Sequence, residues 1–183
     1  MRLAWTLSSI GELSASLFVK LRLILGLSFS TVPAGIRSYV GGALAVAASG
    51  PSAGSSGDFI STHVSVSSFY LSSHHLVAFD GDCLRTVFLH EAAHSLDQGL
   101  SGSTVWHNAV ANSTCVPDDY ANSSYAEDFA QMEDMYNYRR HRDTFPMPAA
   151  CLIPQMYVMS QTTRIRDANA RLRCNTDKRP FYL

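Results

Sequence analysis

Five consecutive residues, His90-Glu91-Ala92-Ala93-His94, form an H-E-x-x-H motif. On a helix, the two histidines lie one turn apart on one face, where both imidazoles can reach the same metal ion. Glu91 lies beside them, close enough to accept a proton from a water molecule that the metal activates. Chance would give about 0.006 such motifs in a chain of this composition. The motif therefore predicts a zinc site with its own general base.

A catalytic zinc site usually has a third protein ligand. The metzincin continuation, which requires glycine at position 97 and histidine at position 100, is absent from this chain. Either a carboxylate from a second helix or the downstream His107 could complete the site. We favour Glu127, because it lies in the first turn of a predicted helix among apolar residues.

Glu127 also has a purely structural interpretation. Ser124-x-x-Glu127 is a capping box, in which the glutamate satisfies the first N–H groups of its own helix. If Ser123 is the cap instead, Glu127 is free to bind metal. The sequence leaves both roles open.

Two helices must position these residues. The first is predicted from about Leu84 to Gln98, and Gly99 ends it. The face opposite the histidines is apolar and should pack into the core. The second helix is predicted from about Tyr125 towards Arg142.

The rest of the chain gives weaker structural signals. Residues 41–58 are almost entirely Gly, Ala, Ser and Val, which predicts a loop. Alternation over His63–Leu71 and the apolar run Leu76–Phe79 predict two strands. A helical pattern resumes over Thr163–Arg173.

Length and composition predict one low-charge domain. The chain has 183 residues, of which 46% are hydrophobic and 16% charged, with a net charge of −1. It is long and apolar enough to bury a core. No basic field is available to bind nucleic acid or anionic lipid. A surface of small polar residues is common outside cells, and we expect a secreted monomer.

The N-terminal segment has two interpretations. Its apolar stretch, residues 17–29, is interrupted by Lys20 and Arg22 and is too short and too charged for stable membrane insertion. Residues 1–34 are therefore either a leader or an N-terminal helix. Residues 35–183 are predicted to form a single domain.

Cysteines and glycosylation motifs also favour a secretory route. The four cysteines lack a C-x-x-C pair, which disfavours a thiolate zinc cluster and favours two disulfides. We favour Cys83 with Cys115 and Cys151 with Cys174, because these pairs close moderate loops. Two N-glycosylation motifs begin at Asn112 and Asn122.

The segment from His90 to Asp97 resembles the zinc helix of the anthrax-lethal-factor-like gluzincins. In that family, H-E-x-x-H is followed three residues later by Asp, and a Glu on a following helix completes the site. A Tyr lies seven residues before that Glu, as Tyr120 does before Glu127. The longer stretch from His90 to Gln131 is similar to a family of fungal secreted proteins assigned by motif as zinc peptidases, which includes the conidiation-specific proteins.

The resemblance implies an α+β, zincin-like catalytic domain with a small sheet, the H-E-x-x-H helix and a following glutamate helix. It implies that one Zn²⁺ ion is bound by His90, His94 and Glu127. It also implies that Glu91 acts first as general base and then as general acid.

The resemblance assigns two further residues. Tyr120 would donate a hydrogen bond to the transition state, with Tyr125 as the alternative donor. Asp97 could accept the remaining N–H of a ligand imidazole, or it could simply solvate the end of its helix. Together these residues predict a secreted zinc metallopeptidase that acts on peptides or proteins. The alternative is a secreted protein of the same fold that acts in binding or development without catalysis.

Overall fold

The computed structural model describes residues 29–30, 32–48, 52–56, 59–65, 81–141 and 149–172. The longer helices are α5 (Gly81–Asp97), α6 (Thr104–Asn112), α7 (Tyr125–His141), α8 (Ile153–Gln161) and α9 (Thr163–Ala170). The shorter helical elements are α2 (Ala34–Arg37), η1 (Ala121–Ser123) and η2 (Ala149–Leu152). One sheet contains β1 (Gly42–Ala48), β2 (Ser52–Ser56) and β3 (Phe59–Ser65).

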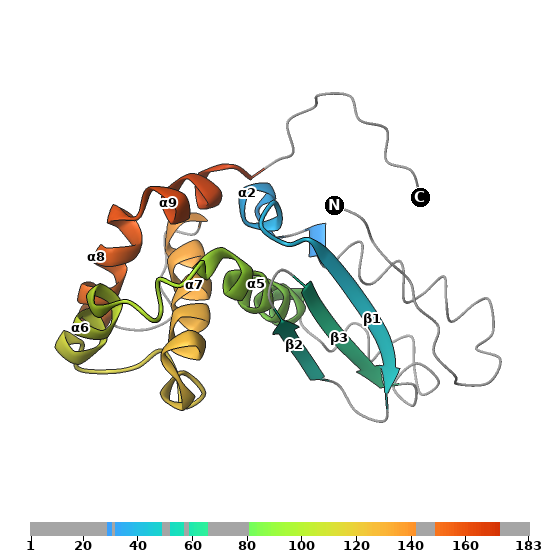
Figure 1. The fold of residues 1–183 in the computed structure, drawn as a ribbon, viewed down its shortest axis with the longest axis horizontal. Helices are drawn as coiled ribbons and strands as arrows, with labels where there is room; N and C mark the ends of the chain where they lie inside the picture. Colours follow the sequence, from blue (N-terminus) through green and yellow to red (C-terminus); the bar gives the residue numbers. More distant parts are fainter. Residues whose placement is uncertain are drawn as a thin grey trace.

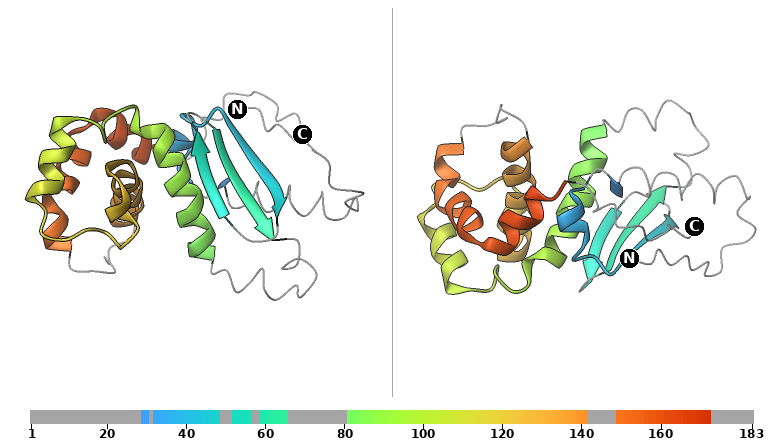
Figure 2. Two further views of the ribbon diagram at one scale, coloured as in Figure 1. Left: turned by 60° about the horizontal axis from the view of Figure 1, so that its bottom comes forward. Right: turned by 90° about the horizontal axis from the view of Figure 1, so that it is seen from above.

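Helix α5 occupies the middle of the molecule (Figure 1). It packs against α7 on one side and against β2 on the other. Figure 2 shows the same arrangement from two further directions, with the sheet and the group α6–α8 on opposite sides of α5. The helix that carries the H-E-x-x-H motif is therefore held from both sides.

The ends of α5, α6 and α7 follow from local sequence signals. Gln98 and Gly99 have φ angles of 45° and 84°, so the chain leaves α5 through the left-handed conformation that glycine tolerates best. Ser103 Oγ accepts a hydrogen bond from the Trp106 N–H and caps α6. Ser124 Oγ accepts one from the Glu127 N–H and caps α7. The predicted helices around Leu84–Gln98 and from Tyr125 are confirmed.

Helix α2 packs closely against the last described helix, α9. A side chain at Gly35 would collide with the backbone of Ala168, so only glycine allows this approach. The Gly35 N–H donates to the carbonyl oxygen of Arg171 at 2.9 Å, and the Arg171 guanidinium donates to Ser38 Oγ at 2.7 Å. These contacts join the two ends of the described domain.

The predicted fold class, an α+β zincin-like domain with a small sheet, is wrong. The described domain is mostly helical, and its buried core lies on helices and their connections. Its largest fully buried side chains include Trp106, Phe88, Phe129, Ile36 and Leu96. Strands β1 and β2 are made largely of Gly, Ala and Ser, which offer little apolar area to bury.

The strand predictions were also partly wrong. The composition of residues 41–58 predicts a loop, but the segment contains β1 and β2. Pairing with β3 stabilises them: β1 is parallel to β3, and β2 is antiparallel to it. The strand expected at His63–Leu71 overlaps the end of β3, and its remainder lies outside the described residues, as does the strand expected at Leu76–Phe79.

The preferred disulfide pairing is wrong, because Cys115 is bonded to Cys151, with their Cα atoms 5.5 Å apart. This excludes both predicted pairs, Cys83 with Cys115 and Cys151 with Cys174. The Thr114 N–H also donates to the carbonyl oxygen of Cys151, so the fold brings together two segments that are distant in sequence. Loop length alone could not reveal that contact.

The structure describes only part of the N-terminal segment that bears on membrane insertion. Among the described residues, no helix has both the length and the apolar character needed to cross a membrane. Most of the predicted leader or helix at residues 1–34 lies outside the described residues.

Candidate metal centre

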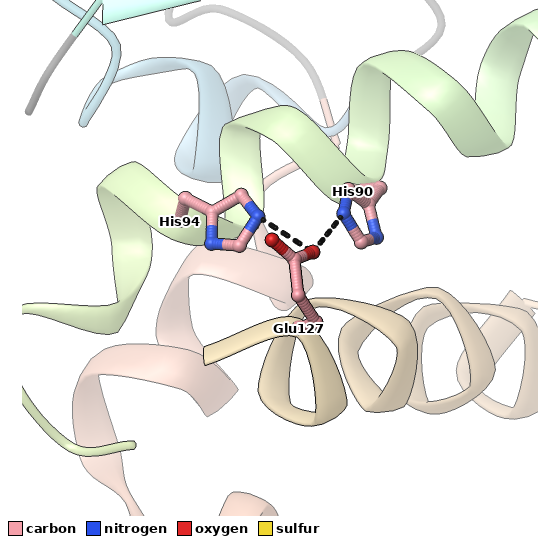
Figure 3. A group of neighbouring side chains, drawn as sticks. All are labelled: His90, His94 and Glu127. Atoms are coloured by element: carbon pink, nitrogen blue, oxygen red, sulfur yellow. Dashed lines mark hydrogen bonds and ion pairs between the residues drawn. The ribbon is translucent and has the colours of Figure 1, made fainter. Parts of the chain in front are cut away.

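Two helices bring His90, His94 and Glu127 together (Figure 3). Glu127 Oε2 lies 2.9 Å from His90 Nε2 and 3.3 Å from His94 Nε2. One potential ligand atom from each residue lies within 4.8 Å of the others. The three side chains predicted as zinc ligands therefore converge on one point between α5 and α7.

Helical geometry produces this convergence. His90 and His94 lie one turn apart on α5, with ring centroids 5.0 Å apart. Glu127 projects from the first turn of α7, which packs along α5. Ser124, not Ser123, caps α7, yet the Glu127 carboxylate faces the histidines. The cap therefore uses the backbone N–H of residue 127, and the carboxylate of the same residue lies beside the histidines.

The donor set suits a zinc ion. Two imidazole nitrogens and one carboxylate oxygen are ligands that zinc commonly takes in catalytic sites. Zinc–ligand bonds of about 2.0–2.1 Å in tetrahedral geometry place neighbouring ligand atoms about 3.3 Å apart. The separation between His94 and Glu127 equals that value, and the separation between His90 and Glu127 is shorter. A small rotation of the His90 or Glu127 side chain would widen the shorter gap.

His90 is in an environment that favours the neutral imidazole. Burial lowers its pKa, and the neighbouring His94 lowers it further, while Glu127 acts in the opposite direction. A neutral imidazole is the form that binds metal. The other ring nitrogen, Nδ1, is buried and has no hydrogen-bond partner among the described residues.

Glu91 is buried beside the three convergent residues. Its pKa is raised to about 7, first by burial and then by the negative charge of Glu127. The hydroxyl of Ser55 on β2 donates a hydrogen bond to this carboxylate and partly opposes the rise. A carboxylate with a pKa near neutrality can both accept and return a proton. Sequence reasoning missed Ser55, which lies in a uniform run of small residues.

Tyr120 lies at the exposed side of the same group. Its ring centroid is 5.8 Å from that of His90, and its hydroxyl donates a hydrogen bond to the Glu127 carboxylate. The tyrosine side chain is 53% exposed, so it can also meet a molecule arriving from solvent. Its pKa is raised, mostly by partial burial and then by Glu127 and Glu91.

The two alternative residues lie together elsewhere. Tyr125, the alternative hydrogen-bond donor, is stacked on His107 with ring centroids 3.8 Å apart. His107, the alternative ligand, is not part of the convergent group found among the described residues. Tyr120 and Glu127, in contrast, both lie beside His90.

The carboxylate of Asp97 contacts Ser101. Its two oxygens accept hydrogen bonds from the N–H and the hydroxyl of Ser101, both at 2.7 Å. The Asp97 carbonyl oxygen accepts one from Arg164 on α9. Asp97 therefore stabilises the turn after α5 and links that turn to α9.

The predicted glycosylation positions and two of the cysteines lie outside the metal centre. Asn112, at the end of α6, and Asn122, in η1, are both exposed. The disulfide between Cys115 and Cys151 joins the connection before α7 to the turn before α8. Cys174 lies outside the described residues, as does the side chain of Cys83.

Comparison with known proteins identifies related sequences. The family model for conidiation-specific protein Con-13 matches residues 37–176. Conidiation-specific protein 13 of Neurospora crassa is 31% identical over 90 residues, which cover 43% of this chain and 26% of that protein. The match thus spans about a quarter of the relative's length. No solved structure matches the chain significantly.

Proposed function

We propose that this chain, which belongs to the conidiation-specific protein Con-13 family, is a zinc-dependent metallopeptidase. The observation that carries the proposal is the convergence of His90 Nε2, His94 Nε2 and Glu127 Oε2 beside the buried carboxylate of Glu91. Nothing in the folding of α5 and α7 requires two histidines and a glutamate at one point, since apolar side chains alone would pack the two helices.

The proposal includes a relationship between this site and that of the anthrax-lethal-factor-like gluzincins. The shared features are the H-E-x-x-H helix, the glutamate on a following helix and the tyrosine seven residues before it. The relationship concerns the residues of the site and not the overall fold.

The residues around the site have separate roles in the proposed reaction. His90, His94 and Glu127 would hold a zinc ion, which would lower the pKa of a bound water and polarise the peptide carbonyl group. Glu91 removes a proton from the attacking water and later delivers it to the leaving amine. The Tyr120 hydroxyl donates a hydrogen bond to the oxygen that becomes negative as water attacks the carbonyl carbon. The products are a carboxylic acid and an amine.

We also propose that the protein is secreted and acts on peptides or unfolded proteins. The Cys115–Cys151 disulfide supports an oxidising compartment, where such bonds persist. The exposed Asn112 and Asn122 side chains are accessible for glycosylation. Both features are consistent with secretion.

Cleavage of casein by the purified full chain tests the proposed function. We expect cleavage that stops when a chelator removes the metal and resumes when one equivalent of zinc is returned. Cleavage that persists through exhaustive chelation would contradict a zinc-dependent reaction. Zinc binding with no cleavage of casein or of a peptide library would instead favour the non-catalytic alternative, a secreted binding or developmental protein.

A further inference from the structure

The residues of the proposed site lie on two kinds of element, long helices and a connection with little regular structure. His90, His94 and Glu127 lie on the long helices α5 and α7. Tyr120 lies on the connection between α6 and α7, residues 113–124, which contains only the short turn η1. The hydrogen bond from Tyr120 to Glu127 therefore depends on the conformation of a connection that has little regular structure of its own.

The disulfide anchors the start of this connection. Cys115 is bonded to Cys151, and both half-buried side chains pack against the hydrophobic core. Thr114, next to Cys115, donates its N–H to the carbonyl oxygen of Cys151 at 3.1 Å. The bond thus joins the connection to the turn η2, 36 residues later in the chain.

The remainder of the connection is shaped by short-range hydrogen bonds. Asp118 Oδ1 accepts the Ala121 N–H at 2.9 Å, and the Ser123 hydroxyl donates to the Tyr120 carbonyl oxygen at 2.7 Å. These bonds fix the turn internally, but they do not join it to another element. Ala121 is buried and helps to seat the turn. Turn η1 packs against α7, the helix that follows it, and the disulfide adds a covalent bond to η2, a segment outside the two helices that flank the connection.

We propose that the Cys115–Cys151 disulfide positions Tyr120 at the metal centre, and that reduction of this bond lowers turnover while leaving the zinc ligands in place. This inference rests on the proposed function. A dithiol supplies two electrons and two protons, the S–S bond breaks into two thiols, and the dithiol becomes a disulfide. Released from Cys151, residues 113–124 gain conformational freedom, and the Tyr120 hydroxyl spends less time at Glu127.

A double-mutant cycle tests this inference in the full-length, zinc-loaded protein. Removing one hydrogen-bond donor to a developing oxyanion costs about 100-fold or more in kcat, so we expect that loss for Tyr120→Phe. We expect Cys115→Ser/Cys151→Ser to lower kcat by about tenfold or more, with KM changed much less. In the Tyr120→Phe background the cysteine substitutions should have little further effect, because both changes remove the same interaction.

Two controls separate positioning from general damage to the fold. Zinc affinity should change by less than about threefold in the cysteine variant, because the three ligands lie on helices outside the connection. A dithiol should lower the activity of the wild type but not that of the cysteine variant. If the serine pair does not fold, Cys115→Ala/Cys151→Ala replaces it, since alanine suits the half-buried positions better. Failure of both pairs to fold would indicate a general structural role and overturn the inference.

A measurement that does not depend on turnover completes the test. Fluorotyrosine placed at position 120 reports its surroundings by ¹⁹F NMR. We expect a zinc-dependent shift in the oxidised protein that is lost on addition of a dithiol. Additive losses in kcat, or a zinc-dependent shift that persists after reduction, would overturn the inference. An inactive wild type that keeps the reduction-sensitive shift would refute the proposed peptidase function but leave the positioning of Tyr120 by the disulfide intact.

Discussion

Two carboxylates on the same helix, Glu127 and Glu133, have opposite environments. Glu127 lies in the first turn of α7, is partly exposed, and faces the Nε2 atoms of two histidines. Glu133 is fully buried; its Oε1 accepts a hydrogen bond from Asn169 Nδ2 on α9, and Oε2 has no partner among the described residues. Burial raises the pKa of Glu133 to about 8, although the hydrogen bond from Asn169 opposes the rise.

The difference shows that burial alone does not identify a functional carboxylate. Glu133 is the more buried of the two, but its described hydrogen-bond partner is an amide, and Asn169 also accepts a hydrogen bond from Asn137. This network joins α7 to α9. Glu127 has two imidazoles within reach, so it can share a cation with them.

The largest expected effect comes from the proposed general base. Glu91→Gln removes the group that accepts the proton but keeps its size, so we expect casein cleavage to fall by about 100- to 10,000-fold. Zinc content should remain at the wild-type level. Glu133→Gln makes the same chemical change in the structural network and should retain activity. Turnover by Glu91→Gln at the wild-type rate would refute the role of Glu91.

Substitution of the two α7 carboxylates, Glu127 and Glu133, should affect zinc affinity differently. Glu127→Gln should weaken zinc binding by about 100-fold or more, since even the loss of a residue that supports a ligand costs about 10- to 100-fold. The cap on α7 is expected to persist, because Ser124 contacts the backbone N–H of residue 127. Competition against a chromophoric chelator measures the affinity. Equal zinc affinity in Glu127→Gln and Glu133→Gln would contradict the contrast.

The raised pKa of Glu133 predicts that the stability of the protein depends on pH. Between the unfolded pKa of 4.5 and the folded value of about 8, the unfolded chain has lost the Glu133 proton and the folded chain keeps it. The free energy of unfolding should therefore fall as pH rises through this range, by up to about 1.4 kcal/mol per pH unit. Glu133→Gln should reduce this slope.

Urea unfolding of the metal-free protein from pH 5 to pH 8 measures that slope. The raised pKa of Glu91 contributes to it with the same sign, so the informative quantity is the difference between wild type and variant. Asp167→Asn, at an exposed position on α9, serves as the matched control and should keep the wild-type slope. Identical slopes in wild type and Glu133→Gln would show that Glu133 is ionised in the folded protein.

The smallest expected effect concerns Ser55. Ser55→Ala removes one hydrogen bond to Glu91, which corresponds to about 0.5–1.5 kcal/mol, or roughly a two- to tenfold loss in kcat. Ser55→Thr keeps a hydroxyl and should recover much of that activity. If the alanine and threonine variants are equally impaired, packing of β2 and not the hydrogen bond explains the loss.

The sequence predicted the features that depend on local patterns. The H-E-x-x-H spacing, the apolar face of α5, Gly99 after it and Ser124 before α7 all act within one or two helical turns. These signals were enough to place His90 and His94 on one face and Glu127 in the first turn of its helix.

The features that depend on distant contacts could not be predicted. The strands at residues 42–56 are made mostly of residues with weak strand preference, and pairing with β3 stabilises them. The Cys115–Cys151 bond depends on how the connection before α7 meets the turn η2. The contact from Ser55 to Glu91 depends on the position of β2 beside α5. The sequence of each segment contains no signal for these partners.

The most direct test of the central claim is metal analysis of the full chain combined with X-ray absorption at the zinc edge. We predict one zinc per chain, with two imidazole nitrogens among its ligands, and loss of that zinc in the His90→Ala/His94→Ala variant. Wild-type protein that binds no zinc after incubation with one equivalent, or a double variant that keeps a full equivalent, would contradict the claim that His90, His94 and Glu127 form a metal centre.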